Sequence, residues 1–112
     1  MKDDRAYLSH VRDALDRILD YTRDGRQSFL ADRKTQDAVI RNFEIVGEAA
    51  KHLSAEIRAR EPSVDWKAVA GMRDKLIHAY FGVKLDVVWR AVEMEVQPLR
   101  EAAVRLLETV DR

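Results

Sequence analysis

Apolar residues recur at helical spacing along three long stretches of this chain. They return every three or four positions, which is the period at which one face of an α-helix repeats. The first stretch covers residues 4–23, and its apolar positions are Leu8, Val11, Leu15 and Ile18. The pattern predicts a helix with one buried face, begun by Asp3 or Asp4 as the N-cap and ended at Gly25.

The second stretch begins after a short polar segment that contains Gln27 and Ser28. Its apolar positions continue without a break as Val39, Phe43, Val46, Ala50, Leu53 and Ile57. Asp32 is a suitable N-cap, and Pro62 disfavours helical angles in the residue before it. We therefore predict one long helix from Asp32 to about residue 60.

The C-terminal half predicts a short helix followed by a long one. The short helix, capped by Ser63 or Asp65, is interrupted or bent at Gly71 and continues to residue 80. The long helix covers residues 87–110, and its apolar positions are Val92, Val96, Leu99, Ala103, Leu106 and Val110. The sequence therefore predicts an all-α fold, an antiparallel bundle of four main helices with a short or broken third helix, in a single domain of residues 1–112.

Composition narrows the possible functions. The chain has no cysteine, which excludes disulfides, thiolate catalysis and cysteine-ligated zinc. Its 20 basic and 20 acidic residues cancel, which argues against non-specific coating of nucleic acid. The first residues are too polar for a signal peptide, and no apolar run reaches membrane-spanning length, so we expect a cytoplasmic protein without a membrane partner.

One loose basic cluster lies between the first two predicted helices. Its members are Arg23, Arg26, Arg33 and Lys34, and three aspartates are interleaved with them. Mixed charges of this kind usually form a solvated surface, and we interpret the cluster in that way.

The strongest candidate for chemistry is the run 71–82, where a cation, an imidazole and a phenol lie between two glycines. On a helix, Asp74 and His78 are close enough to hydrogen-bond, which would favour the charged imidazole. Arg73 and His78 point about 140° apart on a straight helix. Two copies of the chain meeting across a two-fold axis would bring them together more naturally, which suggests a composite site on a homodimer.

The residue types in this run limit the reaction that it supports. The chain has no serine–histidine–acid arrangement and no phosphate-binding glycine-rich loop, and its three histidines fall on three different predicted helices, so we expect neither a metal nor a cofactor. An imidazole that transfers protons and a guanidinium that grips phosphate suffice for metal-independent cleavage of RNA.

The same run carries a family resemblance. Arg73-Asp-Lys-Leu-Ile-His78-Ala-Tyr80 resembles the R-x4-H-x-Y signature of the HepT toxins, a branch of the HEPN superfamily of helical ribonucleases. The run 41–51, Trp66 ahead of Gly71-Met72 and the pair Val88-Trp89 are similar too, so the resemblance covers nearly the whole chain.

The resemblance implies a function and two partners. Such proteins are toxins of two-gene toxin–antitoxin modules, with a small MntA-like nucleotidyltransferase as antitoxin. Their ribonuclease site lies at the homodimer interface and uses the residues that correspond to Arg73 and His78. The antitoxin silences the toxin by adding AMP to the tyrosine that corresponds to Tyr80.

Three further residues match family positions. Asp74 is the polar residue that typically follows the arginine, and we expect it to have a supporting role. Asn42 and Glu48 belong to the motif on the second helix, and they either line the cleft or support it.

A second function of a different class is compatible with the same helices. The chain would then be a non-catalytic subunit that docks a nucleotidyltransferase or binds a nucleotide, with no ribonuclease activity. Its neutral net charge favours this alternative slightly, because a free ribonuclease is expected to carry more positive surface.

Overall fold

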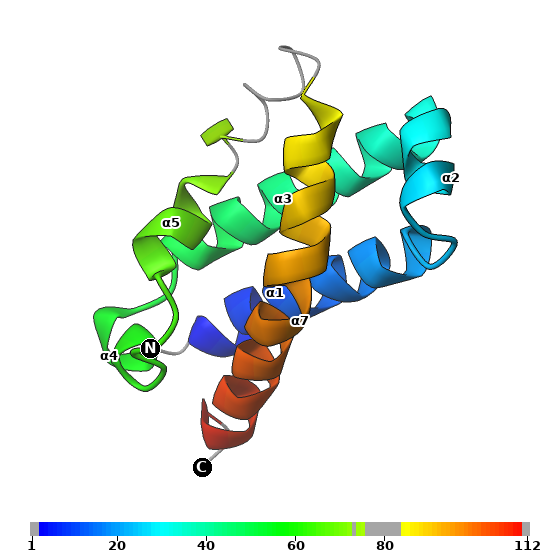
Figure 1. Cartoon of the computed structure of the whole chain (residues 1–112). Coiled ribbons are helices and arrows are strands. Elements are labelled where there is room, and N and C mark those ends of the chain that lie inside the picture. The colour runs from blue at the N-terminus through cyan, green and yellow to red at the C-terminus, as the bar shows by residue number, and fades with distance from the viewer. Residues whose placement is uncertain (1–2, 73, 76–83, 111–112) are drawn as a thin grey trace.

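The computed structural model describes residues 3–72, 74–75 and 84–110, and every regular element within these ranges is a helix. The all-α prediction is therefore confirmed. The helices, labelled in Figure 1, are α1 (Asp4–Tyr21), α2 (Arg26–Ala31), α3 (Arg33–Lys51), α4 (Ala55–Ala59), α5 (Trp66–Ala70) and α7 (Leu85–Val110).

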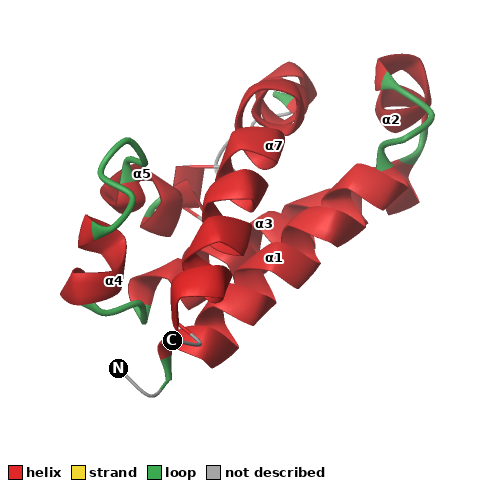
Figure 2. Cartoon of the chain, turned by 90° about the horizontal axis from the view of Figure 1, so that it is seen from below, coloured by secondary structure: helices red, strands yellow, loops and turns green. Residues whose placement is uncertain are grey.

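Three long helices form the body of the molecule. Helices α1 and α3 run antiparallel to each other, and α7 crosses this pair in both Figure 1 and Figure 2. Helix α2 lies at one end of the pair, whereas α4 and α5 lie toward the other end, which is also where the chain begins. An ion pair between Arg100 and Asp16 joins α7 to α1.

The apolar positions predicted from the sequence form the core. Every predicted apolar position of the first two stretches is at most 3% exposed. In α7 the predicted positions from Val92 to Leu106 are also buried, and Val110 is half-buried. Helical periodicity therefore identified the buried faces correctly.

The prediction of one helix from Asp32 to about residue 60 is wrong, because α3 ends at Lys51 and α4 begins at Ala55. The backbone between them turns to an extended conformation at Ser54, whose hydroxyl accepts a hydrogen bond from the Ile57 N–H at 3.1 Å and caps α4. The buried carboxylate of Asp4 holds Ser54 in place by accepting from its N–H at 2.9 Å and from its hydroxyl at 2.6 Å.

The first helix begins at residue 4 as predicted, but the predicted side-chain cap is not made. Asp3 occupies the N-cap position of α1 but makes no side-chain cap hydrogen bond. Asp4 is 1% exposed, and its carboxylate accepts from Ser54 rather than from the first turn of α1. Asp4 therefore stabilises the start of α4 and does not cap α1, the helix that it begins.

The prediction of a polar connection after the first helix is also wrong, since residues 26–31 form helix α2. Gly25 permits the turn into α2 with a positive φ of 91°, a conformation that other residues rarely adopt. Phe29 anchors the helix, because it is fully buried and its ring centroid lies 5.4 Å from that of Trp89. The side-chain amide of Gln36 donates to the Phe29 carbonyl at 3.0 Å and fixes the end of α2.

The basic cluster around α2 is partly neutralised and solvent-exposed. Arg23 lies 3.3 Å from Asp20, and Arg33 lies 3.9 Å from Asp37, with all four side chains at least half exposed. This agrees with a solvated surface. Among the described residues, no helix has both the length and the apolar character needed to cross a membrane.

Candidate functional site

Arg73, His78 and Tyr80 lie outside the described residues, so the structure defines the site by the elements on either side of them. On the N-terminal side stands α5, capped by Asp65, whose carboxylate accepts from the Ala68 N–H at 3.0 Å. The assignment of the three signature residues to catalysis and modification stays a prediction.

Helix α5 is anchored by a tryptophan. The indole N–H of Trp66 donates to the carbonyls of Arg58 at 3.1 Å and Glu61 at 3.2 Å, and only 8% of the residue is exposed. These bonds tie the start of α5 to the end of α4. They fix the direction from which the chain enters the signature.

The predicted interruption at Gly71 is confirmed, because α5 ends at Ala70 with Gly71 as its C-cap. Helical conformation resumes at Met72, which is 5% exposed, and includes Asp74 and Lys75. Asp74 is exposed, and its predicted hydrogen bond with His78 remains a prediction.

On the C-terminal side, the first turns of α7 are equally well anchored. Val88 is fully buried, and Trp89 is 8% exposed and packs against Phe29. The helix begins at Leu85, two residues earlier than predicted. The signature is therefore bounded by two elements that are both packed into the core.

Two hollows beside this boundary carry positive side chains that the sequence analysis did not single out. Lys75 and Arg90 line a hollow of about 250 Å³. Arg90 also lines a second hollow of about 430 Å³, together with Arg26. None of these three cations forms an ion pair with another described residue, although Glu93 and Glu95 also line these hollows. Arg90 was missed because no motif marks it, and only the packing of α7 brings it near Lys75.

Asn42 is positioned by the contact between α1 and α3. It is 5% exposed, its side-chain oxygen accepts from Arg17 Nε at 2.7 Å, and its amide nitrogen donates to the Ala38 carbonyl at 2.8 Å. Both polar atoms of its side chain therefore have partners within this chain. This geometry is that of a residue that orients α3 against α1.

Glu48 lies elsewhere on α3 and is exposed. Its carboxylate is 4.0 Å from Lys51 Nζ and 3.6 Å from His52 Nε2, and the His52 ring stacks on Tyr7 with centroids 4.8 Å apart. The structure therefore does not bring Glu48 to Asn42, and the cleft roles considered for both residues stay predictions.

An ion pair between Glu61 and Arg105 fixes the segment before α5 against α7. Arg105 Nε and Nη2 donate to the two oxygens of Glu61 at 3.0 and 2.9 Å. These bonds to Arg105 hold the pKa of Glu61 below its ordinary value and raise the pKa of Arg105. Within the ranges that the structure describes, no group of three histidine or carboxylate side chains is arranged to hold a metal ion.

The described part of the chain is all-helical, and its sequence carries an arginine, a histidine and a tyrosine between α5 and α7, as expected of a helical ribonuclease-like domain. The family described as “Ribonuclease HepT-like” matches residues 11–106, and this chain belongs to that family. The match includes both sides of the signature and the signature itself.

Several curated proteins are similar to this chain. The “Probable ribonuclease HepT” of Thermococcus cleftensis is 43% identical over 95 residues, which cover 84% of this chain and 86% of that protein. “Putative RNase MJ0127” of Methanocaldococcus jannaschii is 45% identical over 92 residues, which cover 81% of this chain and 76% of that protein.

A longer relative also matches. The “Gamma-glutamylcyclotransferase and putative RNase MJ0434” of Methanocaldococcus jannaschii is 39% identical over 112 residues, covering 99% of this chain but only 50% of that protein. The chain therefore spans half the length of this relative. No solved structure matches the chain.

Proposed function

We propose that this chain is a metal-independent endoribonuclease that acts as the toxin of a toxin–antitoxin module. The observation that carries the proposal is the position of the signature 73–80 inside the match to the HepT-like ribonuclease family. In the proposed reaction the ribose 2′-oxygen attacks the phosphorus, and the bond to the 5′-oxygen breaks. His78 takes the proton from the 2′-hydroxyl or gives one to the leaving 5′-oxygen, and Arg73 stabilises the charge on the phosphoryl oxygens.

We propose further that the active form is a homodimer. One face of α7 supports this proposal, because Met94 is 63% exposed there and Arg90, one turn away, forms no ion pair with a described residue. Exposed methionine and arginine are enriched at protein interfaces. Asp86 and Glu93 line the same hollow as Arg90, so the face carries both charges and suits pairing with its own copy across a two-fold axis.

Met94→Glu is expected to convert the dimer into a monomer and to abolish RNA cleavage, because it replaces the exposed apolar side chain of the proposed interface with a charge. Sedimentation velocity measures the mass, and circular dichroism checks that the helices are retained. Tyr21→Glu is a matched control, since Tyr21 is also an exposed apolar residue, at 40%, and lies on α1. A Met94→Glu protein that stays dimeric would place the interface on another surface.

The proposed antitoxin is a nucleotidyltransferase that adds AMP to Tyr80. A phosphate and a nucleoside on Tyr80 would lie beside Arg73, and would exclude RNA by charge and by volume. The alternative function is the non-catalytic docking subunit, which the neutral net charge favours slightly.

The test that separates the two functions uses protein expressed alone and protein co-expressed with the nucleotidyltransferase of a neighbouring gene. The toxin is expected to cleave RNA in the presence of a chelator when expressed alone. After co-expression it is expected to gain the mass of AMP and to lose the activity, whereas Tyr80→Phe should gain no mass. A tight complex without added mass, together with a free protein that leaves RNA intact, would support the docking subunit.

A further inference from the structure

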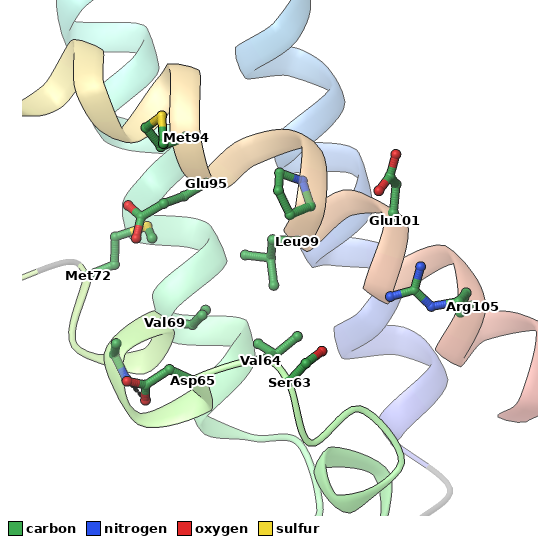
Figure 3. A pocket seen from close by; sticks show the side chains of 12 residues that line it. Ser63, Val64, Asp65, Val69, Met72, Met94, Glu95, Leu99, Glu101 and Arg105 are labelled. Atoms are coloured by element: carbon green, nitrogen blue, oxygen red, sulfur yellow. Dashed lines mark hydrogen bonds between the residues drawn. The ribbon is translucent and has the colours of Figure 1, made fainter.

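A groove of about 330 Å³ lies between α7 and the segment that leads into α5 (Figure 3). Leu99 points from α7 toward the opposite wall, which contains Val64 of this segment and Val69 of α5. Met72 and Pro98 add further apolar surface. The groove therefore has an apolar floor built from two parts of the chain that are about thirty residues apart in sequence.

The rim of this groove is acidic. Asp65, Glu95 and Glu101 line it, and none of the three forms a salt bridge with a described residue. Among the described residues that line the groove, the cation is Arg105, whose guanidinium is bound by both oxygens of Glu61 and also interacts with Glu101. With Glu61 already bound to Arg105, the three carboxylates of the rim outnumber this cation, and the described lining has a net negative charge.

The charge and the shape of the groove indicate which kind of molecule it can bind. A carboxylate rim repels the phosphates of RNA and attracts ammonium and guanidinium groups. Apart from Met94, which the proposed dimer contact uses, the lining residues of α7 extend from Glu95 to Arg105, which corresponds to about 15 Å along a helix axis. This length suits an extended or helical peptide segment, and the volume holds a few of its side chains.

We propose that this groove docks a segment of a partner protein in which apolar side chains are flanked by lysine or arginine. The apolar side chains pack on Val69 and Leu99, and the basic ones pair with Glu95 and Glu101. Because Met72 forms part of the wall and directly precedes the signature, the bound segment lies beside the element that leads into it. The proposal goes beyond the proposed function, since it does not require that the chain cleaves RNA.

The test measures binding of a short fluorescein-labelled helical peptide of leucine, alanine and lysine, with its leucines on one face, by fluorescence anisotropy. A second peptide has glutamate in place of every lysine. The lysine peptide is expected to bind at least about ten-fold more tightly than the glutamate peptide, because two or more weak ion pairs become repulsive. The double variant Glu95→Lys/Glu101→Lys is expected to reverse this preference.

A second variant tests the groove without changing its charge. Ala68 is exposed and lines the groove, so Ala68→Phe should fill it and abolish binding of the lysine peptide while RNA cleavage stays unchanged. Lys67→Phe is the control, because Lys67 is the neighbouring exposed residue of α5 and does not line the groove. The proposal would be overturned if the two peptides bound with equal affinity or if neither bound. It would also be overturned if Ala68→Phe bound the lysine peptide unchanged, or if single-stranded RNA displaced the peptide.

Discussion

His78→Ala is expected to reduce RNA cleavage by about three orders of magnitude, which is the usual effect of removing a general acid or base. The variant keeps every described core residue, so we expect its unfolding free energy to stay close to that of the unaltered protein. Cleavage of a fluorescent RNA in the presence of a chelator measures the activity, and urea unfolding measures the stability.

His52→Ala is the matched control for this experiment. His52 is half exposed and stacks on Tyr7 at the far end of α3, so its removal should leave the cleavage rate unchanged. A His78→Ala protein that cleaves RNA as fast as the unaltered protein would exclude His78 from proton transfer.

Arg73 allows a finer version of the same test. Arg73→Ala is expected to reduce cleavage by about 10² to 10³, the range for loss of one group that stabilises charge in the transition state. Arg73→Lys keeps the positive charge but loses the planar fork that grips two phosphoryl oxygens, so it should restore only part of the activity. Full activity in Arg73→Lys would mean that charge alone is needed.

The parts of the fold that were predicted correctly depend on local sequence. An apolar residue every three or four positions identifies a buried helical face wherever the helix packs, and Phe43 and Val96 are buried for that reason. Asp65 as the cap of α5 and Gly71 as its end were also correct, because caps act within four residues.

The parts that were missed depend on contacts between residues that are distant in sequence. The apolar pattern continues from Ala50 through Ile57 and conceals the break between α3 and α4, although Ser54 is a residue type that caps helices. The break is stabilised by Asp4, which lies 50 positions away from Ser54. Helix α2 likewise depends on Phe29 packing against Trp89 of α7.

In the candidate site, too, local features could be predicted from the sequence and features that depend on distant contacts could not. The signature 73–80 was found from the residues themselves, because its spacing and chemistry are visible in one short run. The acidic groove was not found, because Asp65 precedes α5 and Glu95 lies on α7, and only the tertiary fold places them on one rim. A single surface charge carries no signal of this kind in sequence.

Asp4→Ala is expected to lower the free energy of unfolding by about 3 kcal/mol, which is large for one polar side chain. The carboxylate of Asp4 is 1% exposed and accepts two hydrogen bonds from Ser54, and it lies at the start of α4, where the helix dipole favours negative charge. Removing it leaves a cavity and deprives the Ser54 N–H of its partner.

A double-mutant cycle tests whether the effect comes from this contact. Ser54→Ala removes the hydroxyl that Asp4 binds and that caps α4, so the combined variant should be less destabilised than the sum of the two single variants, by about 1 kcal/mol or more. Asp3→Ala is the control, since Asp3 is exposed and makes no side-chain cap bond, and it should change the stability by less than about 0.5 kcal/mol. Additive effects of Asp4→Ala and Ser54→Ala would show that the break between α3 and α4 does not depend on their contact, and the start of α4 would then rest on Ser54 and the burial of Ile57 alone.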